Sequence, residues 1–257
     1  MKKILSSALG GLLFTGALIA VGSAPAGAAT TTTVYETTAS SEGWSEQFQR
    51  GTGSLDWTAD GLTFSTPDSN AKYAFGTEVS FPLENLGELS YEVVHGSDGS
   101  NVDQRVAVNV EGTYAGKPFI LIFEPLYTYE RPISGDAQSF DAVLGGTAKW
   151  WTNTDGIAGF PKASSYTPLD EVKQLMPGAT VQKVSLNQGG GNAGLSDTVS
   201  SFTLNGQTWL FEEGAPPVVL TTTTECKSGV WKTSELPVFK NQGDCVSSFA
   251  SAKNGKR

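Results

Sequence analysis

The stretch from Arg105 to Phe123, RVAVNVEGTYAGKPFILIF, contains the two clearest strand patterns in the sequence. In Arg105–Val110 valine alternates with other residues, so three valines lie on one face of an extended strand. Phe119–Phe123 is apolar at every position, which is typical of a central strand covered on both faces. These two segments therefore predict that the core of the protein is built on a β-sheet.

The sequence on either side adds further strands and two hairpin signals, at Asp60-Gly61 and Asn205-Gly206. Apolar and polar residues alternate before and after each dipeptide, and the residues of such turns can adopt positive φ. Other strand candidates lie at Tyr73–Phe81, Leu89–Val94 and Val181–Leu186. Many short strands separated by turns favour two packed sheets.

One short helix is predicted after Thr167, which we expect to cap it, with Pro168 at the first helical position. Leu169, Val172 and Leu175 share one face of this helix, and the chain turns at the Pro-Gly pair that follows. The predicted fold is an all-β, jelly-roll-like β-sandwich with this one helix and a small disulfide-closed C-terminal segment.

Residues 1–28 have the features of a signal peptide. Lys2 and Lys3 precede an apolar stretch, and Ala26-Gly27-Ala28 places small residues where signal peptidase cuts. We therefore expect a secreted, extracellular protein, released or held at the cell surface, with no membrane insertion after cleavage.

The chain of 257 residues has 17 Lys and Arg against 26 Asp and Glu, a net charge of −9. Removal of residues 1–28 takes away two lysines and leaves a net charge of −11. Nucleic-acid binding requires clustered cations that release counterions, so this balance argues against a nucleic-acid partner. One histidine and two cysteines leave no zinc ligand set.

The two cysteines, Cys226 and Cys245, are expected to form a disulfide in an exported protein. A Pro/Thr-rich linker at 215–224 precedes them. The sequence thus predicts a β-sandwich domain at 34–214 and a disulfide-closed motif at 225–252.

Two parts of the chain resemble known groups of secreted proteins. Asn187–Leu195 and Val199–Gly206 are similar to the closing strands of bacterial secreted jelly-roll proteins. This resemblance implies a sandwich like those of carbohydrate-binding modules and concanavalin-type domains, although Ser200 stands where an Asp is usual. Cys226–Lys232 and Lys240–Val246 resemble a two-cysteine motif of largely uncharacterised secreted actinobacterial proteins. The resemblance supports location and fold rather than a reaction.

Aromatic residues supply the candidate ligand-binding site. Trp150 and Trp151 would point to opposite faces of a strand, so one can enter the core while the other stays accessible. Tyr127 and Tyr129, two residues apart, would share a face, with Arg131 beside them. Sugar rings stack on such side chains, while charged neighbours bind the hydroxyls.

The sequence gives weaker indications of catalysis or of a bound ion. Glu111 and Glu124 lie near the ends of neighbouring strand candidates and could face one cleft as a catalytic pair. No cofactor is indicated. A structural calcium ion is left open without an assigned position, although the loop oxygens of Asp98, Asn101 and Asp103 are candidates.

The leading hypothesis is a secreted, non-catalytic β-sandwich protein that binds an extracellular glycan or cell-envelope polymer. The first alternative is an extracellular glycoside hydrolase that uses paired carboxylates. The second is a structural or adhesive envelope protein. Sandwich folds host all three classes.

Overall fold

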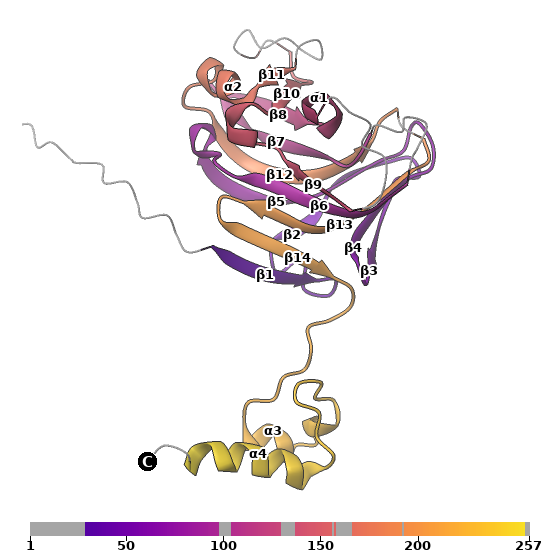
Figure 1. Ribbon diagram of the computed structural model, residues 1–257, viewed down its shortest axis with the longest axis vertical. Helices are drawn as coiled ribbons and strands as arrows, with labels where there is room; N and C mark the ends of the chain where they lie inside the picture. The colour runs from indigo at the N-terminus through magenta and orange to yellow at the C-terminus, as the bar shows by residue number, and fades with distance from the viewer. Residues whose placement is uncertain are drawn as a thin grey trace, which may run out of the picture.

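The computed structural model describes residues 29–97, 104–129, 137–155, 157, 166–191 and 193–254. Within them the chain forms two sheets, each of seven strands, with a few short helices (Figure 1). One cluster of buried apolar side chains takes members from both sheets. The predicted all-β sandwich is confirmed.

The first sheet contains β1 (Thr30–Tyr35), β3 (Ser54–Thr58), β4 (Gly61–Thr66), β6 (Leu89–Ser97), β9 (Gln138–Asp141), β13 (Leu195–Leu204) and β14 (Gln207–Glu212). Strand β13 is its centre: β6 runs along one side, with β9 beyond it. On the other side β4 pairs with the first half of β13 and β14 with the second half. The outermost strand β1 pairs with β14 in parallel.

The second sheet contains β2 (Trp44–Arg50), β5 (Lys72–Pro82), β7 (Ala107–Tyr114), β8 (Lys117–Phe123), β10 (Lys149–Thr152), β11 (Thr167–Pro168) and β12 (Thr180–Gly189). Its strand order is β11-β10-β8-β7-β12-β5-β2, and all neighbours are antiparallel. Because directions alternate, β2, β12 and β8 end at the same edge at which β5 and β7 begin. This edge positions the site described below.

The stretch that indicated the fold lies at the centre of the second sheet. Val106, Val108 and Val110 are fully buried between the sheets, as their alternation predicts. Ala107 and Asn109, on the opposite face, are also almost inaccessible to solvent. Side chains therefore cover the outer face of this sheet as well as its inner face.

The two hairpins differ at their turns. Asn205 and Gly206 both have positive φ, 47° and 86°, as the Asn-Gly signal predicts. Between β3 and β4 only Gly61 has positive φ, because the turn lies at residues 59–60. A Cβ at Gly61 would lie 2.2 Å from the Val199 carbonyl oxygen, so the close approach of β13 also requires glycine there.

The predicted helix is present as α2 (Leu169–Leu175), and Leu169 and Val172 are buried as expected. The expected cap is wrong. Thr167 pairs with Trp150 as part of β11, and Pro168 precedes the helix without any side-chain cap. A second helix, α1 (Pro125–Tyr129), follows β8 and was not predicted. Two 3-10 turns, η1 (Leu83–Asn85) and η2 (Leu144–Gly146), complete the sandwich.

The C-terminal segment contains α3 (Thr223–Lys227), the 3-10 turn η3 (Val230–Lys232) and α4 (Gln242–Asn254). The predicted disulfide joins Cys226 to Cys245. Both cysteines belong to a second buried cluster, separate from the sandwich core, and Trp231 packs at its edge. Figure 1 shows α3 and α4 beyond an extended segment that leaves the sandwich after β14. None of the helices in the described residues is long and apolar enough to span a membrane.

Candidate ligand-binding site

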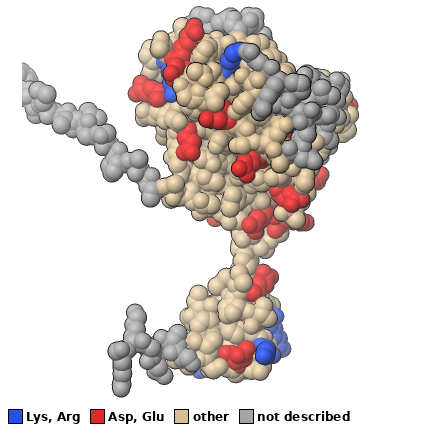
Figure 2. Space-filling model, in the orientation of Figure 1, with Lys and Arg blue, Asp and Glu red and all other residues tan. Residues whose placement is uncertain are grey.

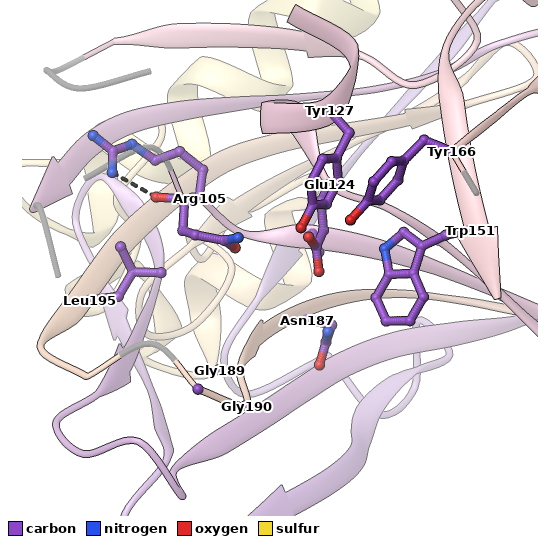
Figure 3. Close-up of a pocket in the computed structure, with 12 residues that line it drawn as sticks. Arg105, Glu124, Tyr127, Trp151, Tyr166, Asn187, Gly189, Gly190 and Leu195 are labelled. Atoms are coloured by element: carbon purple, nitrogen blue, oxygen red, sulfur yellow. Dashed lines mark hydrogen bonds between the residues drawn. The ribbon is translucent and has the colours of Figure 1, made fainter. Parts of the chain in front are cut away.

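A pocket of about 320 Å³ lies at the edge of the second sheet where β12 ends and β7 begins. We call it the aromatic pocket. It is lined by Gln104, Arg105, Ala107, Glu124, Tyr127, Trp151, Tyr166, Asn187, Gly189, Gly190, Gly191 and Leu195. Figure 3 shows the aromatic rings on one side, Arg105 and Leu195 on the opposite side, and Asn187 between them.

Three aromatic side chains form one wall. Trp151 comes from β10, Tyr127 from α1, and Tyr166 from the segment just before β11. The rings of Tyr127 and Tyr166 are stacked, with centroids 3.7 Å apart and planes inclined by 20°. Tyr166 is 40% exposed, so this wall reaches from the pocket to the surface. Flat rings of this kind pack against the C–H faces of a saccharide.

Several buried polar atoms on this side of the sheet lack a hydrogen-bond partner within the described part of the chain. They include Nε1 of Trp151 and Oδ1 of Asn187, which line the pocket, and Oδ1 of Asn109 and Oγ of Ser185. An unsatisfied buried polar group costs about 1–3 kcal/mol, so proteins retain few of them without a reason. Here an N–H donor and a carbonyl acceptor lie in one pocket, and a hydroxyl group can bond to both.

Glu124 is the single carboxylate among the described pocket-lining residues. Burial raises the pKa of this carboxyl above its ordinary value. The side chains of Gln104 and Tyr127, within hydrogen-bonding reach, and the charge of Lys72 act in the opposite direction. Folding therefore shifts the Glu124 carboxyl toward its protonated form relative to an exposed glutamate, and its oxygens offer hydrogen-bonding groups to the pocket.

The same surroundings also change the pKa of Tyr127. Burial raises the pKa of its phenol, and contact with Tyr166 and the nearby charge of Glu124 add to the increase. The hydroxyl thus remains protonated at any physiological pH and serves as a neutral hydrogen-bonding group.

Tyr127 and Tyr129 do not share a face, contrary to the prediction. They lie in helix α1, where residues two apart are rotated by about 200°. Tyr127 lines the pocket, whereas the hydroxyl of Tyr129 accepts a hydrogen bond from the backbone N–H of Asp141 at 2.8 Å. The Tyr129 ring packs edge-on against Phe140 and belongs to the sandwich rather than to the pocket.

The two tryptophans separate as their alternation predicts. Trp150 is completely buried and donates its indole N–H to the Ala142 carbonyl at 2.9 Å. Its inclusion among ligand-contacting residues is therefore not supported by its position, because no ring atom reaches the surface. Trp151 points the other way, into the pocket (Figure 3).

The proposed carboxylate pair is not brought together. Glu111 lines a different cavity, of about 630 Å³, and its Oε2 lies 2.9 Å from Nζ of Lys183. In the β7–β8 register Glu111 faces Ile120, four residues before Glu124, which is roughly 13 Å of strand. Paired glycosidase carboxylates lie about 5–10 Å apart, so this pair lacks the required geometry.

Two expectations fall outside the described residues: Arg131, and the loop with Asp98, Asn101 and Asp103. No group of three or more His, Cys, Asp or Glu side chains suited to a metal ion occurs among the residues that are described.

Sequence reasoning missed several members of the pocket, among them Tyr166, Asn187 and Gln104. Asn187 was visible only as part of a strand end, and the following Gly189–Gly191 was interpreted as a simple turn. These glycines also line the pocket. A polar residue followed by three glycines at a strand end is the signal that could have indicated an open site.

No protein-family model matches the chain, and no curated protein matches it either. Among solved structures, the chain is similar to the family 11 carbohydrate-binding module of the cellulosomal cellulase Lic26A-Cel5E of Clostridium thermocellum. That match has 9% sequence identity and a TM-score of 0.34, and covers 61% of this chain and 85% of the module. A family 11 module from Clostridium thermocellum in complex with a beta-1,3-1,4-mixed-linked tetrasaccharide matches at 6% identity and a TM-score of 0.33. It covers 61% of this chain and 86% of that one.

Proposed function

We propose that the protein binds a saccharide in the aromatic pocket, without transforming it. The observation that carries the proposal is the position of Trp151, whose ring lines the pocket while its buried Nε1 has no partner in the described residues. Asn187 Oδ1 supplies a complementary acceptor in the same pocket. Stacking on the ring and bonding to a hydroxyl are the two interactions a sugar unit requires.

Binding is favoured over hydrolysis because the described pocket residues include one carboxylate. Burial raises the pKa of Glu124, but a glycosidase needs a second carboxylate at the scissile bond. Glu111 lines another cavity and is paired with Lys183. Glu124 therefore acts as a hydrogen-bonding group for the ligand.

The proposal includes the location and organisation expected from the sequence. The protein would act outside the cell after removal of residues 1–28, with the sandwich and the disulfide-closed segment as two domains. The separate buried clusters of the two parts support this division. Mass spectrometry of the protein recovered from the culture medium tests the processing, with a first residue at position 29 as the expected result.

The binding test is a glycan array with the mature protein, accompanied by analysis of the glycans for cleavage products. Trp151→Ala is expected to weaken binding at least tenfold, because it removes the ring and the indole donor together. Trp231→Ala is the matched control, since it removes an indole that packs in the C-terminal segment. Equal binding by wild type and Trp151→Ala, with loss in Trp231→Ala, would contradict the proposal and favour an envelope-docking role of the C-terminal segment. Cleaved glycan would favour the hydrolase alternative.

A further inference from the structure

Arg50 and Lys72 are two cations held opposite each other. They are direct partners in the antiparallel β2–β5 register, at the last residue of β2 and the first of β5. Like charges directly opposite on neighbouring strands repel. This repulsion contributes to the pKa of Lys72, which is lowered first by burial and next by the charge of Arg50.

Neither cation is neutralised within the described part of the chain. Neither forms an ion pair with a carboxylate there. Arg50 uses its Nε–H to bond the Asn70 carbonyl at 2.7 Å, and the Lys72 ammonium lies 5.6 Å from the centre of the Phe48 ring. These contacts orient the two side chains, and the charges of Glu111 and Glu124 act on Lys72 without forming an ion pair with it.

The surrounding composition makes this pair unusual. Residues 29–214 contain 9 Lys and Arg against 23 Asp and Glu, and Figure 2 shows acidic side chains across the visible face of the sandwich. Two other cations of the sandwich are matched: Arg105 lies beside Asp197, and Lys183 beside Glu111. In this acidic domain, two adjacent cations that form no ion pair within the described residues are available to an anionic ligand.

The pair borders the aromatic pocket. Lys72 is the strand partner of Gly189, which lines that pocket, and neighbouring strands lie about 5 Å apart. On the other side, a Cβ placed on Gly190 would lie 3.8 Å from Nη2 of Arg50. Gly190 also lines the pocket, so both cations stand at its rim.

We propose that Arg50 and Lys72 form an anion subsite at the rim of the aromatic pocket, and that the bound saccharide carries a carboxylate or sulfate group. This inference rests on the proposed function and specifies the ligand as an acidic glycan. The guanidinium offers a planar fork that matches two oxygens of such a group, and the ammonium adds a point charge. The exposed ring of Phe48 lies beside the ammonium and can cover part of the same sugar unit.

Glu124 restricts what this subsite accepts. It lines the pocket beyond the glycines, and its charge acts on Lys72. A densely charged polyanion would meet this carboxylate and the acidic surface around it. A glycan with its charged group at the rim and neutral hydroxyls in the pocket would avoid both.

The test measures affinity by isothermal titration calorimetry with the full mature protein. The probes are polysaccharides built on glucose, galactose and mannose, each in a neutral, a uronate and a sulfated form. Arg50→Gln and Lys72→Gln are each expected to weaken binding of the acidic form at least tenfold and of the neutral form less than twofold. Lys117→Gln is the matched control, because it removes one exposed cation at the start of β8, the end of that strand farther from the pocket.

The outcomes separate this inference from the proposed function. Tighter binding of an acidic form than of the neutral form, weakened in Arg50→Gln and Lys72→Gln, supports the inference. The acidic form that binds more tightly, uronate or sulfate, identifies the charged group. Preferential binding of neutral forms, unchanged in Arg50→Gln and Lys72→Gln, would overturn it and leave the saccharide-binding function intact. Absence of binding to every probe would overturn both. Thermal unfolding at low salt gives a reading independent of ligand: each Gln variant should unfold at the same or a higher temperature, since repulsion is relieved.

Discussion

Nε of Arg105 lies 3.8 Å from Oδ1 of Asp197, and both side chains are completely shielded from solvent. The other carboxylate oxygen of Asp197 accepts the backbone N–H of Val106 at 2.7 Å. This pair joins the residues just before β7 in one sheet to β13 in the other, beside the aromatic pocket that Arg105 lines.

Asp197→Asn should therefore destabilise the sandwich strongly. Removing the Asp197 charge breaks a buried pair and takes a carboxylate partner away from the Arg105 guanidinium, and breaking such a pair costs about 3–5 kcal/mol. Urea unfolding followed by tryptophan fluorescence measures the loss. The control is Asp60→Asn, whose carboxylate forms a largely exposed contact with His95 and should change stability by less than about 1 kcal/mol. Similar losses for both variants would show that the buried pair has no special structural role.

The two tryptophans of β10 should separate stability from binding. Trp150→Ala empties a fully buried site in the core and is expected to cost about 3–5 kcal/mol. Trp151→Ala should leave the unfolding midpoint much closer to wild type but reduce glycan binding. Unfolding curves and affinities measured on both proteins check this. A stability loss for Trp151→Ala as large as that for Trp150→Ala would mean that Trp151 is a packing residue.

Glu124→Gln should raise the free energy of unfolding at neutral pH, and the increase should be smaller at pH 4. Because the pKa of Glu124 is raised on folding, its contribution to stability is largest in acid. That contribution is lost as the pH rises from the ordinary Glu value of 4.5 through the folded-state value. Gln is neutral at every pH, so the Glu124→Gln variant does not lose this stability as the pH rises.

Differential scanning calorimetry between pH 4 and 8 measures the effect, with Glu111→Gln as a carboxylate control outside the pocket. An unfolding temperature of Glu124→Gln that falls below wild type at pH 7 would be inconsistent with a destabilising ionised Glu124.

The disulfide should stabilise its own segment and leave the sandwich unaffected. Cys226→Ser/Cys245→Ser removes a bridge that spans 19 residues, and the chain-entropy model assigns such a bridge about 3 kcal/mol. Hydrogen exchange should therefore accelerate in α3 and α4, while the protection of β7 and β12 stays unchanged. Loss of protection in the sheets would show that the two parts unfold together.

The sequence predicted the layers better than the site. Alternation in Arg105–Val110 and across Asn205-Gly206 is a local property of strands, so it was read correctly. Helix α1 was missed because Tyr127 and Tyr129 are two apart, which matches a strand, whereas Pro125 begins a helical turn.

The pocket could be predicted only in part for a different reason. The opposite facing of adjacent strand residues predicted that one of Trp150 and Trp151 would be accessible, but it did not indicate which one. Asn187 and Tyr166 reach the same pocket from distant positions in the chain, through a register that no single segment encodes. Glu124 was identified as a candidate, but its separation from Glu111 depends on the β7–β8 pairing.

The parallel pairing of β1 with β14 sets the order in which the sandwich can be completed. Thr30 lies opposite Gln207, 177 residues later in the chain. At about 5–20 residues per second, a ribosome needs roughly 10–35 s to synthesise that interval. The first strand to be made is thus among the last that can find its neighbour, and until then its backbone hydrogen-bonding groups have no native strand to meet. Until the two strands meet, β1 is an unpaired strand that can pair with a strand of another chain.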